Sequence, residues 1–131
     1  MALEKPYKDI PGTTVFDAEQ SRLGYRLNQF CMTLMKPEGR DIFHADERGT
    51  LVNAGLTEDQ IQGVLDRDYN KLIGLGGNIY FLSKIFSSDG KSFQYAASTM
   101  TGMTEEEYKN MMIAGGRSVE GNRYVGEKSD G

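Results

Sequence analysis

The residues that could carry chemistry in this chain are few and lie far apart. The sequence contains one histidine, His44, and one cysteine, Cys31. A protein metal centre usually needs several His, Cys, Asp or Glu ligands, and a cysteine nucleophile needs a base beside it. His44 lies in the charged stretch FHADER, and Cys31 lies beside an apolar helical stripe. We therefore expect a solvent-facing histidine and a buried cysteine, with no catalytic residue and no metal ligand in this chain.

Acidic residues are plentiful, but their positions favour structural roles. Paired carboxylates can act as acid and base when burial separates their pKa values. The groups in this chain share a helix with Lys or Arg, or lie at a helix start, where acids complement the helix dipole. They are Asp46 and Glu47, Asp66 and Asp68, and Glu105, Glu106 and Glu107. The stretch GLGGN at 74–78 follows a predicted helix and lacks a Lys-Ser/Thr pair, so we do not expect a phosphate-binding loop.

The elements that must position these residues are predicted to be mainly helical. Residues 1–16 contain Pro6 and Pro11-Gly12 and read as an extended arm. Asp17 is expected to cap a first helix, with Gly24 as a weak point inside it. The apolar face of this helix carries Leu23, Leu27, Phe30 and Leu34.

Pro37 is expected to end the first helix and begin a second. In this less regular second segment, Ile42, Phe43 and Leu51 are the expected buried residues. Thr57 and Gln60 form a capping-box pattern that opens a third helix, which we expect to continue to Gly76-Gly77. Its apolar stripe consists of Ile61, Val64, Leu65, Leu72 and Ile73.

The second half of the chain is also predicted to be helical. Asn78 can cap the stretch IYFLSKIFSS, which is apolar on almost every side and is expected at the centre of the domain. A β-hairpin is an alternative, because residues 79–81 are good strand formers, but no partner strand with clean alternation follows. KSFQYAAS could form a short helix, and Thr104 with Glu107 opens a last helix that ends at Gly115-Gly116. We expect one mainly α domain over 1–131, with an arm (1–16), a helical core (17–116) and a loose tail (117–131).

Composition excludes several classes of protein. The chain has 131 residues, 38% hydrophobic and 26% charged, with a net charge of −4. These values are typical of one globular domain, and the scattered Lys and Arg residues argue against a nucleic-acid partner. No apolar run approaches the length of a membrane span. The start MALEKPYKDI lacks the apolar region of a signal peptide, so we expect a cytoplasmic location.

The most unusual stretch is SSDGKSFQYAASTMTGMTEEEY, residues 87–108. It combines a turn signal, three aromatic residues and several hydroxyl groups. Met100 and Met103 flank a Thr-Gly pair in what we expect to be a non-helical connection, and Met is common at adaptable contact surfaces. From the residues alone, the chain is predicted to be a binding or accessory module.

Six stretches resemble, in this order, the alpha (small) subunit of protocatechuate 4,5-dioxygenase. They are DIPGTTVFDAEQSRLGYRLNQFCMTLMK (9–36), LDRDYN (65–70), GGNIYFLSK (76–84), DGKSFQ (89–94), MTGMTEEEY (100–108) and GGRS (115–118). The resemblance covers about residues 7–124. It implies membership of a family of aromatic-ring-opening, extradiol dioxygenases that use Fe(II) and O₂. It also implies that Fe(II) and the catalytic residues belong to the larger beta subunit, usually in an alpha2beta2 heterotetramer.

The resemblance further implies that the alpha subunit packs on beta and forms a lid over the aromatic substrate. Phe93 matches a family aromatic near the pocket entrance, and Ser92, Met100, Thr101, Gly102 and Met103 lie in matching motifs. Gly102 would permit a positive φ or a close backbone approach. The alternative for Phe93 is a core aromatic under the turn.

Three alternatives remain open at this point. The stretch HADERGTLVNAGLTEDQ departs from the family pattern, which leaves the substrate open, and related domains serve gallate and similar acids. A free-standing helical binding or regulatory module is a second alternative. A self-sufficient enzyme is disfavoured, because a two-His, one-carboxylate iron site cannot be built with one histidine.

Overall fold

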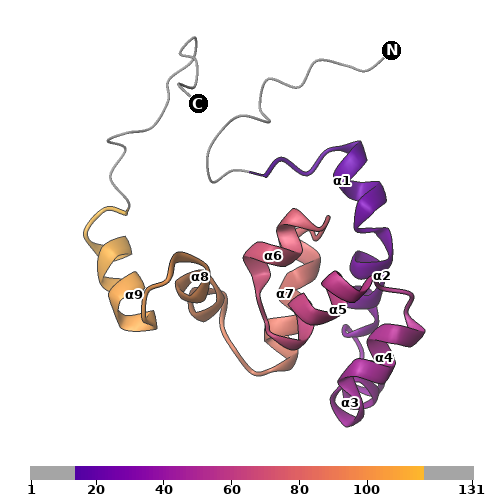
Figure 1. Cartoon of the computed structure of the whole chain (residues 1–131). Coiled ribbons are helices and arrows are strands. Elements are labelled where there is room, and N and C mark those ends of the chain that lie inside the picture. Colours follow the sequence, from indigo (N-terminus) through magenta and orange to yellow (C-terminus); the bar gives the residue numbers. More distant parts are fainter. Residues whose placement is uncertain (1–13, 117–131) are drawn as a thin grey trace, which may run out of the picture.

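The computed structural model describes residues 14–116, and every regular element in this range is a helix (Figure 1). The helices are α1 (Ala18–Leu23), α2 (Tyr25–Thr33), α3 (Pro37–Ala45), α4 (Glu47–Asn53), α5 (Glu58–Leu65), α6 (Tyr69–Gly74), α7 (Ile79–Ser88), α8 (Phe93–Thr101) and α9 (Glu105–Ile113). The mainly α prediction is confirmed, and the hairpin alternative for 79–81 is wrong. Most of the predicted arm and the whole tail, residues 1–13 and 117–131, lie outside the described residues, and residues 14–16 form no regular element.

Capping side chains explain where several helices begin. Asp17 Oδ1 accepts the Gln20 backbone N–H at 2.9 Å and starts α1. Thr57 and Thr104 each form a reciprocal capping box with the residue three positions on, Gln60 and Glu107. Such caps satisfy the backbone donors that a helix start leaves open. These starts were predicted from the sequence, and the structure confirms them.

The predicted first helix is in fact two helices that meet at Gly24. A Cβ atom at residue 24 would lie 1.9 Å from the carbonyl oxygen of Gly76, so the two backbones are in direct contact there. The break turns Leu23 toward solvent, where it is 49% exposed, whereas the other predicted core residues of this face are buried. These are Leu27, Phe30 and Leu34. The prediction that Leu23 shares their face is therefore wrong.

Buried side-chain amides hold the close approach of Gly24 and Gly76. Asn28 Nδ2 donates to Gly76 O, and the Asn78 N–H donates to Asn28 Oδ1, both at 3.0 Å. Gln60 Nε2 donates to Leu75 O at 3.0 Å and to Leu23 O at 3.3 Å. These bonds satisfy buried and partly buried backbone groups where the two loops meet.

The predicted third helix is also divided in two. It stops at Leu65, and α6 begins at Tyr69 after Asp68 Oδ1 accepts the Lys71 N–H at 3.2 Å. Between them Arg67 has φ +55°, the only positive φ of a non-glycine residue in 14–116. Because this conformation is unfavourable for an L-residue, it needs strong local contacts to persist.

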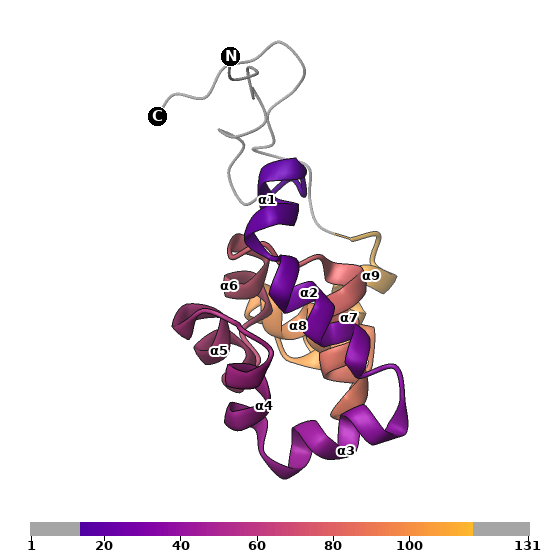
Figure 2. The same cartoon turned by 90° about the vertical axis from the view of Figure 1, so that its right-hand side faces the viewer.

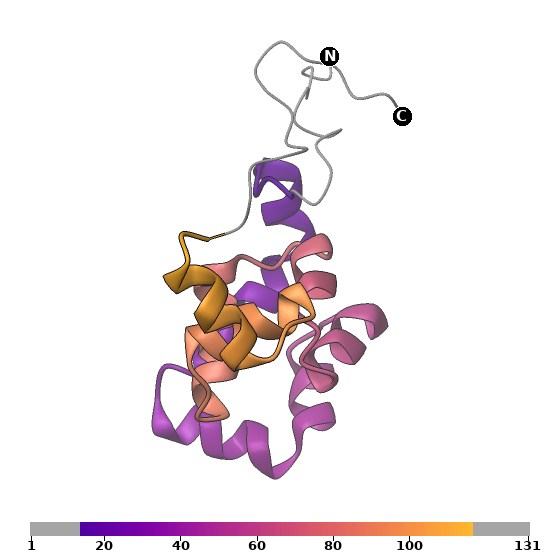
Figure 3. The same ribbon diagram turned by 90° about the vertical axis from the view of Figure 1, so that its left-hand side faces the viewer.

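Helix α7 lies between α2 and α8, and α9 packs on α8. Figure 2 shows α2 in front of α7, and Figure 3 shows the opposite side with α9 nearest the viewer. The core around α7 includes Leu82, Ile85 and Phe86, with Phe43 from α3. Two expectations for burial are wrong, because Ile42 on α3 is 64% exposed and Tyr80 at the start of α7 is 80% exposed. No helix within 14–116 combines the length and the hydropathy that a membrane span requires.

Candidate functional site

The start of α8 presents an aromatic side chain at the surface. Ser92 caps the helix, with its Oγ accepting the Tyr95 N–H at 3.0 Å. Phe93, the first residue of α8, is 60% exposed. Its ring contacts Phe86 edge-to-face, with a centroid distance of 5.9 Å. Phe93 is therefore not a core residue, and the core alternative for it is not supported.

The other predicted site residues lie at the end of α8. Met100 and Thr101 belong to the helix, so the prediction of a non-helical connection there is wrong for these two residues. Gly102 ends α8 with φ +73°, the left-handed conformation that glycine adopts without strain. Met103 follows, and its N–H donates to Ser98 O at 3.0 Å. Met100 packs against the core and is only partly buried.

The candidate residues therefore form two groups rather than one. Ser92 and Phe93 begin α8, whereas Met100, Thr101, Gly102 and Met103 end it. At 1.5 Å per residue, the ends of a helix of this length lie about 12 Å apart. A single small ligand contacting one group would not contact the other, so the two groups can only frame opposite sides of a surface.

An ion-pair cluster lies beside α8, centred on Arg67. Arg67 Nε and Nη2 donate to the Asp89 carboxylate at 2.7 and 3.1 Å. Nη1 and Nη2 donate to the Glu47 carboxylate, both at 2.9 Å, and Nη1 also donates to Val64 O at 2.7 Å. The guanidinium group lies 5.3 Å from the centroid of the Phe43 ring. All five N–H donors of the guanidinium are thus used.

The cluster shifts the protonation equilibria of its members. Hydrogen bonds from Arg67 lower the pKa of Glu47, although burial acts in the opposite direction. Burial lowers the pKa of Arg67, but its hydrogen bonds to Asp89 and Glu47 outweigh burial and raise the pKa above its ordinary value. Burial also raises the pKa of Tyr69. The cluster therefore holds a fixed cation and an ionised Glu47 at neutral pH.

Sequence reasoning missed Arg67, because its partners are distant in the chain. It singled out the flanking acids Asp66 and Asp68, whereas the arginine between them makes the tertiary contacts. The signal that could have found it was LDRDYN itself, a motif of the family resemblance with no assigned role. A cavity of about 500 Å³ lies beside the cluster. Its lining includes Arg67, Tyr69, Asp89, Lys91, Tyr95 and Thr99.

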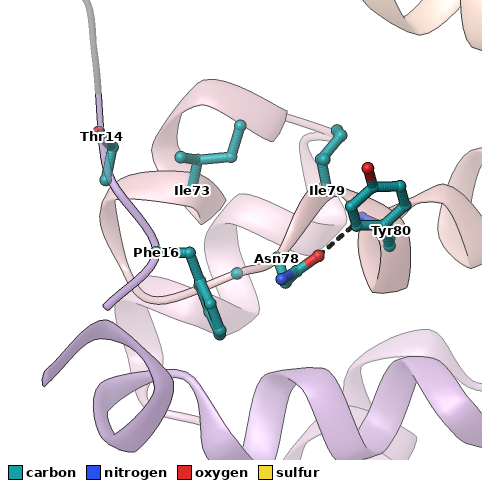
Figure 4. Close-up of a pocket in the computed structure, with 7 residues that line it drawn as sticks. Thr14, Phe16, Ile73, Asn78, Ile79 and Tyr80 are labelled. Atoms are coloured by element: carbon teal, nitrogen blue, oxygen red, sulfur yellow. Dashed lines mark hydrogen bonds between the residues drawn. The ribbon is translucent and has the colours of Figure 1, made fainter. Parts of the chain in front are cut away.

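A second, more apolar cavity of about 220 Å³ lies where the segment before α1 meets the start of α7. Figure 4 shows Phe16 from that segment, with Ile73 from α6 and Ile79 and Tyr80 from α7 around it. Asn78 Oδ1 accepts the Tyr80 N–H at 2.9 Å and fixes the start of α7 at the edge of this cavity. Its lining carries no ionisable group other than the Tyr80 hydroxyl, so it favours an apolar contact.

The histidine and the cysteine lie as predicted. His44 is exposed, with Nδ1 3.3 Å from Glu47 Oε2 and Nε2 3.1 Å from Ser88 O. Cys31 is buried, and burial raises its pKa to about 12, which keeps the thiol protonated. Among residues 14–116 no group of three or more His, Cys, Asp or Glu side chains is arranged to hold a metal ion.

Comparison with known proteins places this arrangement in a family. Over 101 residues the chain is 29% identical to a gallate dioxygenase of Pseudomonas putida. That alignment covers 77% of this chain but 30% of the relative, so the chain spans less than a third of the relative's length. Residues 27–113 match the family model for the LigA subunit of the aromatic-ring-opening dioxygenase LigAB. The match includes every helix from α3 to α9 and all of the candidate site, so the chain belongs to the LigA subunit family of aromatic-ring-opening dioxygenases.

Proposed function

We propose that this chain is the non-catalytic alpha subunit of a heteromeric extradiol dioxygenase that opens the ring of protocatechuate by 4,5-cleavage. Membership of the LigA subunit family supports a role beside a larger subunit. The observation that carries the proposal furthest is the exposed aromatic side chain of Phe93 at the start of α8, within the matched range. Exposed apolar side chains that gather on one surface mark a contact site, and Phe93 lies on the helix that packs against α9, where Met112 and Ile113 are also exposed.

Fe(II) would be held by the large beta subunit rather than by this chain. A non-haem iron site of the two-His, one-carboxylate type needs two histidines, and this sequence has one. The residues of this chain therefore do not fit an iron site of this type. When bound, Fe(II) supplies activation of O₂ and of the catecholate, and that chemistry belongs to the partner.

The contribution of this chain would be a lid over the partner's pocket. Phe93 and Ser92 would cover one side of the aromatic substrate, and the group from Met100 to Met103 would face the partner or the far side of the entrance. A lid excludes bulk water, which strengthens electrostatic interactions in the pocket and protects reactive intermediates. The lid would also shape the pocket around the part of the substrate away from the metal, and so influence selectivity.

Gallate is the second candidate substrate, and the relative named gallate dioxygenase favours it. Protocatechuate and gallate share a carboxylate and a vicinal diol, and differ by one ring hydroxyl. A protein discriminates such a pair through hydrogen bonds to the additional hydroxyl. The hydroxyl group of Ser92, beside Phe93, is the candidate in this chain.

A free-standing binding or regulatory module remains the competing class. Three exposed side chains argue against it: Tyr80 is 80% exposed, Ile113 is 74% exposed, and Phe93 is 60% exposed. Helix α9 has no buried residue, although it carries Met111, Met112 and Ile113. A partner subunit that covers these side chains would explain why they are apolar.

The proposal is tested by oxygen consumption with protocatechuate and Fe(II). Three samples are compared: this chain alone, the large subunit from the same organism alone, and the two mixed. We expect turnover to rise at least about tenfold on mixing relative to the large subunit alone. The same comparison with gallate then gives the preference. A mixture that shows neither complex formation nor stimulation would exclude the alpha-subunit role and favour the free-standing module.

A further inference from the structure

Residues 67–70 run from the turn after α5 into the first turn of α6, and they make contacts near both ends of α8. Arg67 donates two hydrogen bonds to the carboxylate of Asp89, the residue that ends α7. Only Gly90, Lys91 and Ser92 separate Asp89 from Phe93. Because Asp89 is held by a bidentate pair, the turn that leads into α8 starts from a fixed point.

Further contacts hold Arg67 and the end of α7 in place. Arg67 is held by Glu47 on α4 and by the Val64 carbonyl, while His44 Nε2 lies 3.1 Å from Ser88 O, next to Asp89. The side chains of Arg67, Glu47 and Asp89 are 20–29% exposed, so solvent only partly screens their charges. These contacts can stabilise the unfavourable φ of Arg67, +55°.

A row of rings supports Phe93 itself. The Tyr69 ring meets Phe86 edge-to-face at 5.4 Å between centroids, with an interplanar angle of 86°. Phe86 in turn meets Phe93 edge-to-face at 5.9 Å, at 77°. Such pairs favour defined ring orientations. Tyr69 is buried, so the row runs from the core to the exposed ring.

Asn70, the residue after Tyr69, contacts the C-terminal end of α8. Asn70 Nδ2 donates to the backbone oxygen of Met100 at 2.8 Å. Met100 O is one of the last four carbonyls of the helix, which lack an intrahelical donor. One short stretch therefore fixes the turn before α8, the ring at its start and the carbonyl at its end.

We propose that Arg67, Tyr69 and Asn70 are positioning residues that set the place of α8, and with it Phe93, against the substrate. This inference rests on the proposed lid function of α8. It assigns the LDRDYN stretch a role of its own, separate from the roles of the lid residues. None of the three residues needs to touch the substrate, because each acts through α8.

Asn70→Ala is the sharpest substitution, because Asn70 is exposed and the change removes one hydrogen bond without opening the core. Kinetic constants for protocatechuate and for gallate are measured on the purified complex in four forms: unchanged, Asn70→Ala, Phe93→Ala and the double variant. We expect Asn70→Ala to lower kcat/KM about threefold to tenfold through α8. In the Phe93→Ala background the same change is expected to have less than about a twofold effect.

Arg40→Ala is the matched control. Arg40 Nη1 also donates to helix-end carbonyls, those of Leu34 and Met35 at 3.1 and 3.3 Å, but at the end of α2. A purely structural role for such bonds would make Arg40→Ala and Asn70→Ala equivalent. We expect Arg40→Ala to leave kcat/KM unchanged in both backgrounds.

A second measurement uses the chain without its partner. The sequence contains no tryptophan, so Phe93→Trp introduces a single fluorescent reporter at the start of α8. Adding Asn70→Ala is expected to lower the emission anisotropy and to raise acrylamide quenching about twofold, because α8 gains freedom. Adding Arg40→Ala is expected to change neither quantity.

The outcomes separate this inference from the lid function. Equal effects of Asn70→Ala in both backgrounds, or an unchanged reporter, would overturn the positioning role while Phe93→Ala could still confirm the lid. Unchanged kinetics in Phe93→Ala would overturn the lid, and the positioning role with it. Two results together support both the lid function and the positioning role. Asn70→Ala must lower kcat/KM only when Phe93 is present, and it must lower the anisotropy and raise the quenching of the fluorescent reporter.

Discussion

At the scale of single residues, Arg67 determines more of this structure than any candidate chosen from the sequence. Its partners Glu47 and Asp89 lie 20 and 22 positions away in the chain. Local patterns predict caps and apolar faces, and therefore identified Asp17, Thr57 and Thr104 as helix starts. They cannot show that an arginine in a turn adopts a positive φ, because tertiary contacts stabilise that conformation.

The Arg67 cluster predicts a specific pH dependence of stability. Its hydrogen bonds lower the pKa of Glu47 in the folded protein below the ordinary value of 4.5. The unfolded state therefore binds the proton more tightly, and the stabilisation is present above that value and is lost as the pH falls through the folded pKa. Urea midpoints measured from about pH 6 to about pH 3 should fall less steeply in Glu47→Gln, which lacks this carboxyl group.

Glu106→Gln is the control for this experiment, because it removes a carboxyl group from the exposed first turn of α9. It should follow the pH dependence of the unchanged chain. Identical pH profiles for Glu47→Gln and the unchanged chain would contradict the stabilising role of the Glu47–Arg67 pair.

At the scale of elements, the helical class and most helix starts were predictable, whereas three breaks were not. They lie at Gly24, at residues 66–68, and at Asp46, which divides the predicted second helix into α3 and α4. Gly24 looked like a weak point within one helix, but the backbone of Gly76 lies against it. Residues 66–68 contain no Gly or Pro, so no local signal marked the end of α5. At α8 a short helix within KSFQYAAS was expected, but the helix is longer, since Met100 and Thr101 extend it toward Gly102.

The close approach of Gly24 and Gly76 predicts that position 24 does not tolerate a side chain. Gly24→Ala would place a Cβ atom 1.9 Å from a backbone oxygen, so the two loops must separate. We expect the free energy of unfolding to fall by about 3 kcal/mol or more, at the upper end for overpacking. Circular dichroism during urea unfolding measures the change.

Gly74→Ala is the matched control for the break at Gly24. Nothing lies within 4 Å of a Cβ atom at Gly74, which is the last residue of α6 and has no positive φ. Since Ala favours helix over Gly by about 1 kcal/mol, this variant should be neutral or slightly stabilised. Equal stabilities of the two variants would show that residues 24 and 76 are not in contact.

At the scale of the whole molecule, the helices divide into a core and a flank. The segment from α2 to α7 supplies all of the buried apolar cluster except Ala96 of α8, and α8 and α9 lie on one side of α7 (Figures 1 and 3). The flank carries the exposed Phe93 and the apolar end of α9. This division, and membership of a small-subunit family, support the proposal that the flank meets a larger subunit. The family resemblance pointed to the segment that carries Phe93. The contacts of Arg67, Tyr69 and Asn70 that support this segment are visible only in the fold.

The central claim, that Phe93 acts on substrate from a subunit without the catalytic centre, is tested most directly by Phe93→Ala in the purified complex. Steady-state oxygen consumption gives kcat and KM, urea unfolding gives stability, and size-exclusion chromatography checks assembly. Ile42→Ala is the control, since Ile42 is similarly exposed, at 64%, on α3, which lies away from α8 (Figures 1 and 2). We predict that Phe93→Ala lowers kcat/KM about tenfold with an intact complex and loses less than about 2 kcal/mol of stability, whereas Ile42→Ala leaves both kinetic constants unchanged. Unchanged kinetics in Phe93→Ala, or a stability loss of about 3–5 kcal/mol that explains the change, would contradict the account.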